Sequence, residues 1–248
     1  MTASGGTLDV DVGNSRVKWR YTADSHVVRG VFDRASAALD DALTATWDRS
    51  LRPSRIRVSS VAGAEFDATL ANSLSATFAQ PPRFARTGRT AGGVTCAYRD
   101  PARMGVDRWL MLLAGWSLVR ARFVVASLGT ASTIDFVDAS GNHRGGYIVP
   151  GPVPMIEGLS ASTAGVRVAP PSVFESLEPG DDTVRCVQHG VARMLVDFVE
   201  QSVTRFDREG PASLLLCGGG VEAIRGHLAV PSRWEPDLVL DGLAVALP

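Results

Sequence analysis

The order of hydrophobic and polar residues predicts alternating strands and helices over the first 119 residues. Residues 7–13 (TLDVDVG) are rich in β-formers and end in a turn signal, and residues 16–22 (RVKWRYT) alternate like a returning strand. Residues 25–30 predict a third short strand. The elements expected after it are a helix over 33–48 capped by Asp33, a strand over 55–61, a helix over 64–78 and a second helix from about residue 102 through RWLMLLAGWSLV.

The same order of elements restarts near Arg120. Residues 122–128 (RFVVASL) predict a buried strand that ends in Gly129, and residues 132–138 predict its hairpin return. The remaining elements expected are a strand over 143–150, helices over 153–161 and 181–208, and a buried strand over 213–217 that enters a glycine turn and a helix.

Two short segments occupy equivalent places in these two rounds. DVGNSRVKW begins at Asp11 and SLGTASTID begins at Ser127, and each consists of a strand, a glycine, a small polar residue and a returning strand. We interpret the repeat as an internal duplication, with α/β halves at residues 1–119 and 120–248 that each open with a three-stranded antiparallel meander. No linker rich in proline, glycine or serine separates the halves, so we expect a continuous helix to join them.

Composition and charge exclude several classes of protein. Of the 248 residues, 45% are hydrophobic and 21% charged, and the formal net charge is −1, which is typical of a packed globular protein without a basic surface for nucleic acid. The longest apolar run, residues 109–119, is too short to cross a bilayer. The N-terminal region carries Asp9 and Asp11 and lacks the pattern of a signal peptide, so we expect a cytoplasmic protein without membrane association.

Cysteine usage agrees with that location. Cys96, Cys186 and Cys217 are odd in number and show no CxxC spacing. A disulfide framework or a zinc site is therefore not expected, and a reducing cytoplasm is. We expect all three to be buried small apolar residues.

Both glycine hairpins suit phosphate binding. Phosphoryl transfer needs backbone N–H groups around the phosphates, a carboxylate for Mg²⁺ and a base that orients the attacking hydroxyl. A glycine followed by a small polar residue at a tight turn brings N–H groups to a phosphate without an intervening Cβ. Asp11 would add the carboxylate, and either Asn14 or Lys18, the only lysine of the chain, would neutralise phosphate charge. Alone, DVGNS is also compatible with a plain hairpin; its repetition favours phosphate binding.

Two further segments are candidates for chemistry. LLLCGGGVEAI is a hydrophobic strand that ends in three glycines, which would let a flat ligand lie on bare backbone at a helix start, although an ordinary tight turn is the alternative. Gly105-Val106-Asp107-Arg108 stands at the start of the apolar helix, where an acid and an arginine often form only a cap and a surface ion pair. The functional interpretation is a base, Asp107, beside an arginine that receives an anionic group. The four histidines show no metal-ligand spacing.

The order of these motifs resembles the type III pantothenate kinase family over nearly the whole chain: DVGNSRVK, Tyr98 ahead of GVDR, LGTASTID, GGYIVPG and DDTVRCVQHG. This family belongs to the superfamily of acetate kinases, sugar kinases and actin. The resemblance implies an α/β fold of duplicated ribonuclease-H-like (actin-like) domains, each with a mixed five-stranded sheet flanked by helices. It also implies an ATP-dependent transferase that phosphorylates pantothenate to 4′-phosphopantothenate, the first step of coenzyme A biosynthesis.

The resemblance also implies roles for individual residues. ATP binding is expected from Asp11, Val12, Gly13, Asn14, Ser15, Arg16, Val17, Lys18 and Thr130, to which the glycine turn adds Gly218, Gly219 and Gly220. Pantothenate binding is expected from Tyr98, Gly105, Val106, Asp107, Arg108 and Thr183. Asp107 would accept the proton, and Asp11 would hold Mg²⁺ through water. In the family the residue at Thr183 comes from the partner subunit, so a homodimer is implied.

One position departs from the family pattern. The family usually has an aspartate two residues before the second motif's glycine, where it helps to bind K⁺ or NH₄⁺, and this chain has Ser127 there. A hydroxyl is a poor substitute for a charged ligand, so activation by a monovalent cation is expected to be weak or absent.

Three other hypotheses remain open at this point. A regulatory accessory protein of the same family would lack turnover, yet Asp11, Asp107 and Arg108 are intact. A kinase for another small hydroxyl substrate fits the phosphate motifs, but Tyr98 with GVDR argues against it. An actin-like filament protein usually needs a longer chain.

Overall fold

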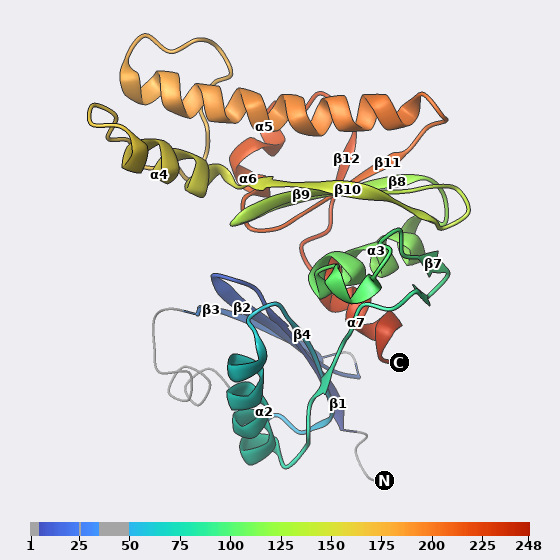
Figure 1. Ribbon diagram of the computed structural model, residues 1–248. Coiled ribbons are helices and arrows are strands. Elements are labelled where there is room, and N and C mark those ends of the chain that lie inside the picture. The colour runs from blue at the N-terminus through green and yellow to red at the C-terminus, as the bar shows by residue number, and fades with distance from the viewer. Residues whose placement is uncertain (1–4, 25, 35–49) are drawn as a thin grey trace. The chain divides into compact units, whose positions relative to one another are not determined.

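The computed structural model describes residues 5–24, 26–34 and 50–248, and it contains two compact units (Figure 1). One unit comprises the chain up to Ala114 together with Leu238–Pro248, and the other comprises Gly115–Asp237. The helix predicted over residues 33–48 falls almost entirely outside the described residues. Asp33, its expected cap, is the last residue of a strand.

The first unit is built on a mixed five-stranded sheet. Its elements are β1 (Gly6–Val12), β2 (Arg16–Ala23), β3 (His26–Asp33), β4 (Pro53–Ser60), α2 (Ala64–Phe78), β5 (Arg83–Phe84), β6 (Thr90–Ala91), β7 (Val94–Thr95), a 3₁₀ turn (Pro101–Arg103), the start of α3 (Val106–Val119) and α7 (Leu238–Ala246). The sheet has the order β3-β2-β1-β4-β5, with β1 to β3 antiparallel and β4 and β5 parallel to β1. The predicted opening meander is therefore confirmed.

Alternation along β1 gives this sheet one apolar and one charged face. Leu8, Val10 and Val12 are completely buried in a cluster with Leu70 and Leu74 of α2. Burying a side chain of this kind contributes about 1.5–3 kcal/mol, which holds the helix on that face. Because successive strand residues point to opposite faces, the aspartates between them face away from α2.

The second unit repeats the same design. Its elements are the end of α3, β8 (Phe123–Leu128), β9 (Ala131–Val137), β10 (His143–Pro150), α4 (Pro152–Ser162), α5 (Thr183–Asp207), β11 (Ser213–Cys217), α6 (Val221–Ile224), a 3₁₀ turn (Arg225–His227) and β12 (Ser232–Trp234). The sheet order, β10-β9-β8-β11-β12, is that of the first unit, with the same strand directions. Helix α5 covers one face of the sheet (Figure 1). The predicted duplicated α/β fold is confirmed.

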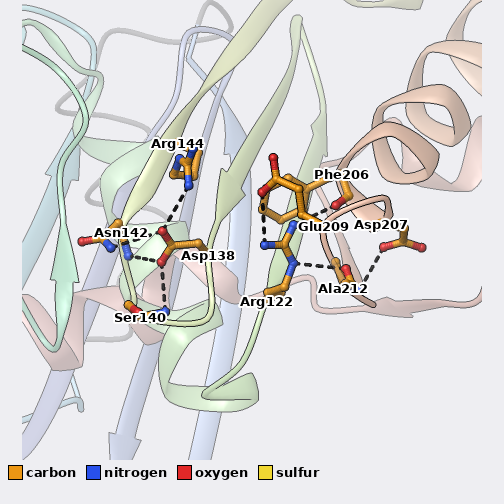
Figure 2. Close-up of polar contacts among 10 residues, drawn as sticks. Arg122, Asp138, Ser140, Asn142, Arg144, Phe206, Asp207, Glu209 and Ala212 are labelled. Atoms are coloured by element: carbon orange, nitrogen blue, oxygen red, sulfur yellow. Dashed lines mark hydrogen bonds and ion pairs between the residues drawn. The ribbon is translucent and has the colours of Figure 1, made fainter.

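Polar clusters hold the ends of the second unit's elements, as Figure 2 shows. At the start of β8, Arg122 donates hydrogen bonds to the carbonyl oxygens of Phe206 (2.7 Å) and Gly210 (3.1 Å), and its guanidinium lies 4.0 Å from the Phe206 ring centroid. In the β9–β10 turn, Asp138 accepts N–H groups of Ser140 and Asn142, both at 2.9 Å. These contacts fix the end of α5 and the hairpin that leads into β10.

The C-terminal helix α7 groups with the first unit, although the sequence placed residues 120–248 together in the second half. Arg20 Nη1 lies 2.6 Å from Asp241, and a Cβ at Gly242 would come 2.2 Å from the carbonyl oxygen of Leu110 in α3. Nothing in the local sequence indicates these partners, because they lie more than a hundred residues earlier in the chain.

Helix α3 is apolar, and two of the three cysteines are buried. Residues 108–116 of α3 are all buried, and none of the helices described here is long and apolar enough to span a membrane. Cys96 and Cys217 are buried as expected, but the expectation was wrong for Cys186. That residue lies on the exposed first turns of α5, where its Sγ donates to the Gly180 carbonyl oxygen (3.2 Å).

Candidate active site

The charged face of the first sheet carries a row of three polar residues. Asp11 on β1 pairs directly with Lys18 on β2 and with Ser59 on β4. Directly paired residues of neighbouring strands point to the same face, so the three side chains project together. The strand register places Lys18 on the same face as Asp11, although a residue on a returning strand can also point to the opposite face. Sequence analysis did not find Ser59, since its position depends on the pairing of β4.

Asp11 carries a perturbed carboxylate. Burial and the negative charge of Asp107 raise its pKa from 3.8 to about 6, and the opposing influence of the Ser59 hydroxyl and the Lys18 ammonium is smaller. The residue is only half-buried as a whole, but its Oδ1 atom is inaccessible and has no hydrogen-bond partner among the described residues. A carboxylate in this state is suited to interact with a cation that neutralises it.

Gly105, two residues before Asp107, leaves room for the Asp107 side chain to fold back over the start of α3. A Cβ at position 105 would lie 2.6 Å from Asp107 Oδ1, and the same oxygen accepts the N–H of Arg108 at 2.8 Å. The carboxylate is thus held at the first turn of α3, where acidic groups are favoured by the helix dipole. The structure therefore brings together Asp11 and Asp107, which are far apart in the sequence.

Tyr98 and Arg108, predicted to bind pantothenate, contact each other. Arg108 Nη1 donates to the Tyr98 hydroxyl at 2.8 Å, and the guanidinium lies 5.8 Å from the ring centroid. Arg108 is only 4% exposed, whereas Tyr98 is half-buried. A buried guanidinium anchored by a tyrosine is a good receptor for a carboxylate, since its planar fork matches two oxygens.

The first phosphate motif forms a tight hairpin. Gly13 donates its N–H to the Arg16 carbonyl oxygen at 2.9 Å, and Arg34 donates to the Gly13 carbonyl oxygen at 3.1 Å. Asn14, Ser15 and Arg16 are exposed at the turn, while Val12 and Val17 are buried on either side. The predicted turn is present in the first unit with its polar residues on the surface.

In the second unit, the second and third glycine motifs touch. The Gly220 N–H donates to the Leu128 carbonyl oxygen at 2.8 Å, and Gly218 adopts φ +93° with its Cβ position only 2.3 Å from that oxygen. A Cβ at Gly151 would come 1.8 Å from the Gly129 carbonyl oxygen. Only glycine permits these approaches, so the turns form one backbone surface. Helix α6 has four residues, so its dipole is too small to carry the anion preference expected for a helix start.

Thr130 and Thr183 also lie in the second unit. Thr130 is exposed on the β8–β9 turn, and its carbonyl oxygen accepts the Gly151 N–H at 2.9 Å. Thr183 is the exposed first residue of α5, next to the Asp182 cap, which accepts the Arg185 N–H at 2.8 Å. Contact of Thr183 with a partner subunit stays a prediction.

Ser127 occupies the position in the second unit that Asp11 occupies in the first. Its paired neighbours are Thr133 on β9 and Cys217 on β11. Thr133 Oγ1 is buried without a hydrogen-bond partner in the described part of the chain. Asp135, further along β9, is buried against His143 at 3.0 Å. No group of three or more histidine, cysteine, aspartate or glutamate side chains able to hold a metal was found in residues 5–24, 26–34 and 50–248.

Comparison with known proteins agrees with this arrangement. The family model for type III pantothenate kinase matches residues 7–205. The type III pantothenate kinase of Pseudomonas putida is 36% identical over 97% of this chain and 98% of its own. A Campylobacter jejuni protein described as a Baf family transcriptional activator has a similar structure, with a TM-score of 0.58, 17% identity and coverage of 96% and 95% of the two chains.

A second solved structure has a similar fold. A Sinorhizobium meliloti protein described as a 2-dehydro-3-deoxygalactonokinase matches with a TM-score of 0.55 and 14% identity over 97% of both chains. At such low identity, these two structures show the fold alone. The sequence relatives carry the assignment further, since they match nearly the whole chain, including the segments that supply Asp11, Tyr98 and Asp107. On this basis the chain belongs to the type III pantothenate kinase family.

Proposed function

We propose that this protein transfers the γ-phosphoryl group of ATP to the hydroxyl group of pantothenate, giving 4′-phosphopantothenate and ADP at the first step of coenzyme A biosynthesis. The observation that carries the proposal is the pair of carboxylates, Asp11 and Asp107: burial, together with the negative charge of Asp107, raises the pKa of Asp11 to about 6. One carboxylate can bind a metal ion and the other can accept a proton, which are the two roles that phosphoryl transfer requires of acidic groups.

Asp107 acts as the base in this proposal. The pantothenate hydroxyl loses its proton to the Asp107 carboxylate as its oxygen bonds to the γ-phosphorus and the bond from phosphorus to the ADP oxygen breaks. Arg108 binds the pantothenate carboxylate, and Tyr98 holds Arg108 in place through the 2.8 Å hydrogen bond. Gly105 directly precedes α3, and Val106 is its first residue, so these two residues lead into the helical turn that carries Asp107 and Arg108.

The residues of the first unit fit a magnesium ion brought by ATP. The inaccessible Asp11 Oδ1 has no hydrogen-bond partner in the described residues, and its like-charged neighbour is Asp107. Asp11 would hold the ion through water, and when bound the ion would neutralise charge on the phosphates. Lys18, on the same face as Asp11, would add a second positive charge toward ATP.

The residues around Ser127 do not fit a charged K⁺ or NH₄⁺ site. The row Ser127, Thr133 and Cys217 has no formal charge in its usual protonation state, and the nearby Asp135 is hydrogen-bonded to His143. We therefore infer that this enzyme works without strong activation by a monovalent cation.

We further infer a homodimer in the cytoplasm. Thr183 is exposed at the start of α5, as a residue contributed to a partner's pantothenate site would be. Strand β10 exposes Tyr147 (49%) and Ile148 (61%), which are large apolar side chains for a strand whose outer edge pairs with no other strand among the described residues. Light scattering measures the mass in solution, and a monomer under assay conditions would contradict this proposal.

ADP release from ATP tests the proposed function directly. Pantothenate and a panel of other small hydroxyl compounds, including sugars and sugar acids, are supplied separately with MgATP. We expect ADP release with pantothenate alone, together with a phosphorylated product identified by mass spectrometry. Release with a different compound would identify a kinase for another substrate, and no release with any compound would favour a regulatory protein without turnover.

A further inference from the structure

The segment that carries Tyr98 is a short hairpin followed by an irregular loop. Strands β6 and β7 are joined by Gly92 and Gly93, both with positive φ (+55° and +88°), which is the conformation of a two-residue hairpin turn. Arg89 precedes the hairpin, and Cys96 follows it and donates its N–H to the Arg89 carbonyl oxygen at 2.9 Å. Residues 96–100, which lead to the 3₁₀ turn, belong to neither a helix nor a strand.

Arg89 bridges this loop with its guanidinium group. Its Nη1 donates to the carbonyl oxygens of Cys96 (3.2 Å) and Tyr98 (2.7 Å), and its Nη2 donates to that of Arg99 (2.6 Å). A guanidinium can do this because its donors form a rigid planar fork. Three carbonyl groups that sheet pairing leaves unused are thereby held around one side chain, which restricts the loop to one conformation.

Tyr98 is consequently fixed at both ends. Arg89 holds its backbone carbonyl, and the buried Arg108 holds its hydroxyl at 2.8 Å. The two arginines differ in surroundings, since Arg108 is 4% exposed and Arg89 lies on the surface. Both terminal nitrogens of Arg89 are directed at the chain, so its contacts organise the loop that presents Tyr98.

We propose that Arg89 is a positioning residue for pantothenate binding, which acts by holding the 96–99 loop so that Tyr98 meets Arg108 and the substrate. This inference rests on the proposed function, because it takes Tyr98 and Arg108 as substrate contacts. Arg89 contributes to the affinity for pantothenate and not to ATP binding or to proton transfer by Asp107.

Steady-state kinetics of three variants test this role. In Arg89→Ala the KM for pantothenate should rise about tenfold, the effect of losing a hydrogen bond to a charged group, while kcat and the KM for ATP stay unchanged. Arg89→Lys keeps the charge but not the fork, so its KM should stay close to that of Arg89→Ala. Arg86→Ala is the matched control, since Arg86 is an exposed arginine of the same segment.

A Tyr98→Ala background shows whether Arg89 acts through Tyr98. There, Arg89→Ala should add little to the KM for pantothenate, because coupled residues are not additive. A full additional increase in that background would overturn the proposal, as would complete rescue by lysine, which would indicate simple attraction of the substrate's negative charge. Equal KM values for Arg89→Ala and the wild type, even with a lower melting temperature, would also overturn it and leave Arg89 purely structural.

The same data separate this inference from the proposed function. A wild type that phosphorylates pantothenate but is insensitive to Arg89→Ala contradicts the positioning role alone. If the wild type shows no turnover but binds pantothenate in calorimetry, weaker binding by Arg89→Ala still supports the positioning role. A wild type that neither binds nor phosphorylates pantothenate overturns both.

Discussion

The two sheets have the same strand order but different chemistry at equivalent positions. In the first unit, the residue two before the motif glycine is Asp11, and its strand neighbours are Lys18 and Ser59. In the second unit the corresponding residue is Ser127, with Thr133 and Cys217 beside it. The first row contains charge of both signs, and the second contains only small side chains.

The two units of this duplicated fold therefore offer different chemical groups to a ligand. The first unit has the carboxylates Asp11 and Asp107 and the buried Arg108, so in the proposed function it would contribute side-chain charge. The second unit instead brings the Leu128–Thr130 turn against Gly218–Gly220, where backbone atoms approach each other closely. Side-chain removal should therefore damage the first unit most, and an added Cβ should damage the second.

The largest effect is expected from Asp107→Asn in the first unit. Its kcat should fall about 10²–10⁴-fold, the usual contribution of a general base, while the KM for ATP and the melting temperature stay close to the wild type. Rapid-quench or coupled assays measure kcat. Near-wild-type turnover would remove Asp107 from the mechanism and leave only a helix cap.

Loss of the other carboxylate should be nearly as severe. Asp11→Ala is expected to lose about 10²-fold in activity, in the range seen when a group that stabilises developing charge is removed. Raising the Mg²⁺ concentration should restore it only in part. Unchanged Mg²⁺ dependence in the variant would show that Asp11 does not act on the metal.

The pH dependence provides an independent test of Asp11. Because its folded-state pKa is raised from 3.8 to about 6, the folded protein binds a proton in this range that the unfolded chain does not. Without Mg²⁺, this contribution to the free energy of unfolding is present below pH 3.8 and is lost as the pH rises through about 6. Activity should have the opposite pH dependence, because it should fall as the pH drops below about 6 and the Asp11 carboxylate becomes protonated. Asp11→Ala should abolish the stability change in this pH window.

In the second unit, Gly218→Ala should weaken ATP binding and lower stability by about 1–3 kcal/mol, the usual cost of overpacking. The added Cβ would meet the Leu128 carbonyl oxygen at 2.3 Å, and φ is +93°. Gly226→Ala is the control, since nothing lies within 4 Å of its Cβ position. Thermal melts and the KM for ATP compare the two. Equal effects would show that the glycine turn has no special role.

Ser127→Asp would place a carboxylate in the second unit at the position equivalent to Asp11 in the first. A unit charge pair 4 Å apart is worth about 4 kcal/mol at an effective dielectric of 20, and even a third of that is about tenfold in affinity. We expect little K⁺ activation in the wild type and stronger activation in Ser127→Asp, but not in the uncharged Ser127→Asn. The measurement is initial rate against KCl, with choline chloride holding ionic strength constant. Steep, saturating activation of the wild type would contradict the comparison.

The smallest effect is expected from Lys18→Met. Loss of one partly exposed positive charge on the Asp11 row should raise the KM for ATP by a few-fold, with the KM for pantothenate unchanged as the internal reference. Lys18→Arg, which keeps the charge, should restore most of the ATP affinity. If Lys18→Met binds ATP normally, the single lysine of this chain has no role at the phosphates.

Local patterns in the sequence determined most elements and the order of the motifs. The strands predicted over residues 143–150 and 213–217 match β10 and β11 to the residue. Alternation, helical spacing and glycine turns act over a few neighbouring residues, so they can be read without knowing the rest of the fold. Asp11, Asp107 and Tyr98 could be singled out as candidates for the same reason.

Only the tertiary structure decided which of these residues meet. Pairing of β1 with β4 brought Ser59 beside Asp11, and packing of α7 on the first sheet placed Asp241 against Arg20. Closure of the β6–β7 hairpin brought Arg89 to the carbonyl groups of the Tyr98 loop. These contacts depend on strand register and on packing between distant segments. Local sequence does not encode them, because each partner's pattern is equally compatible with many other neighbours.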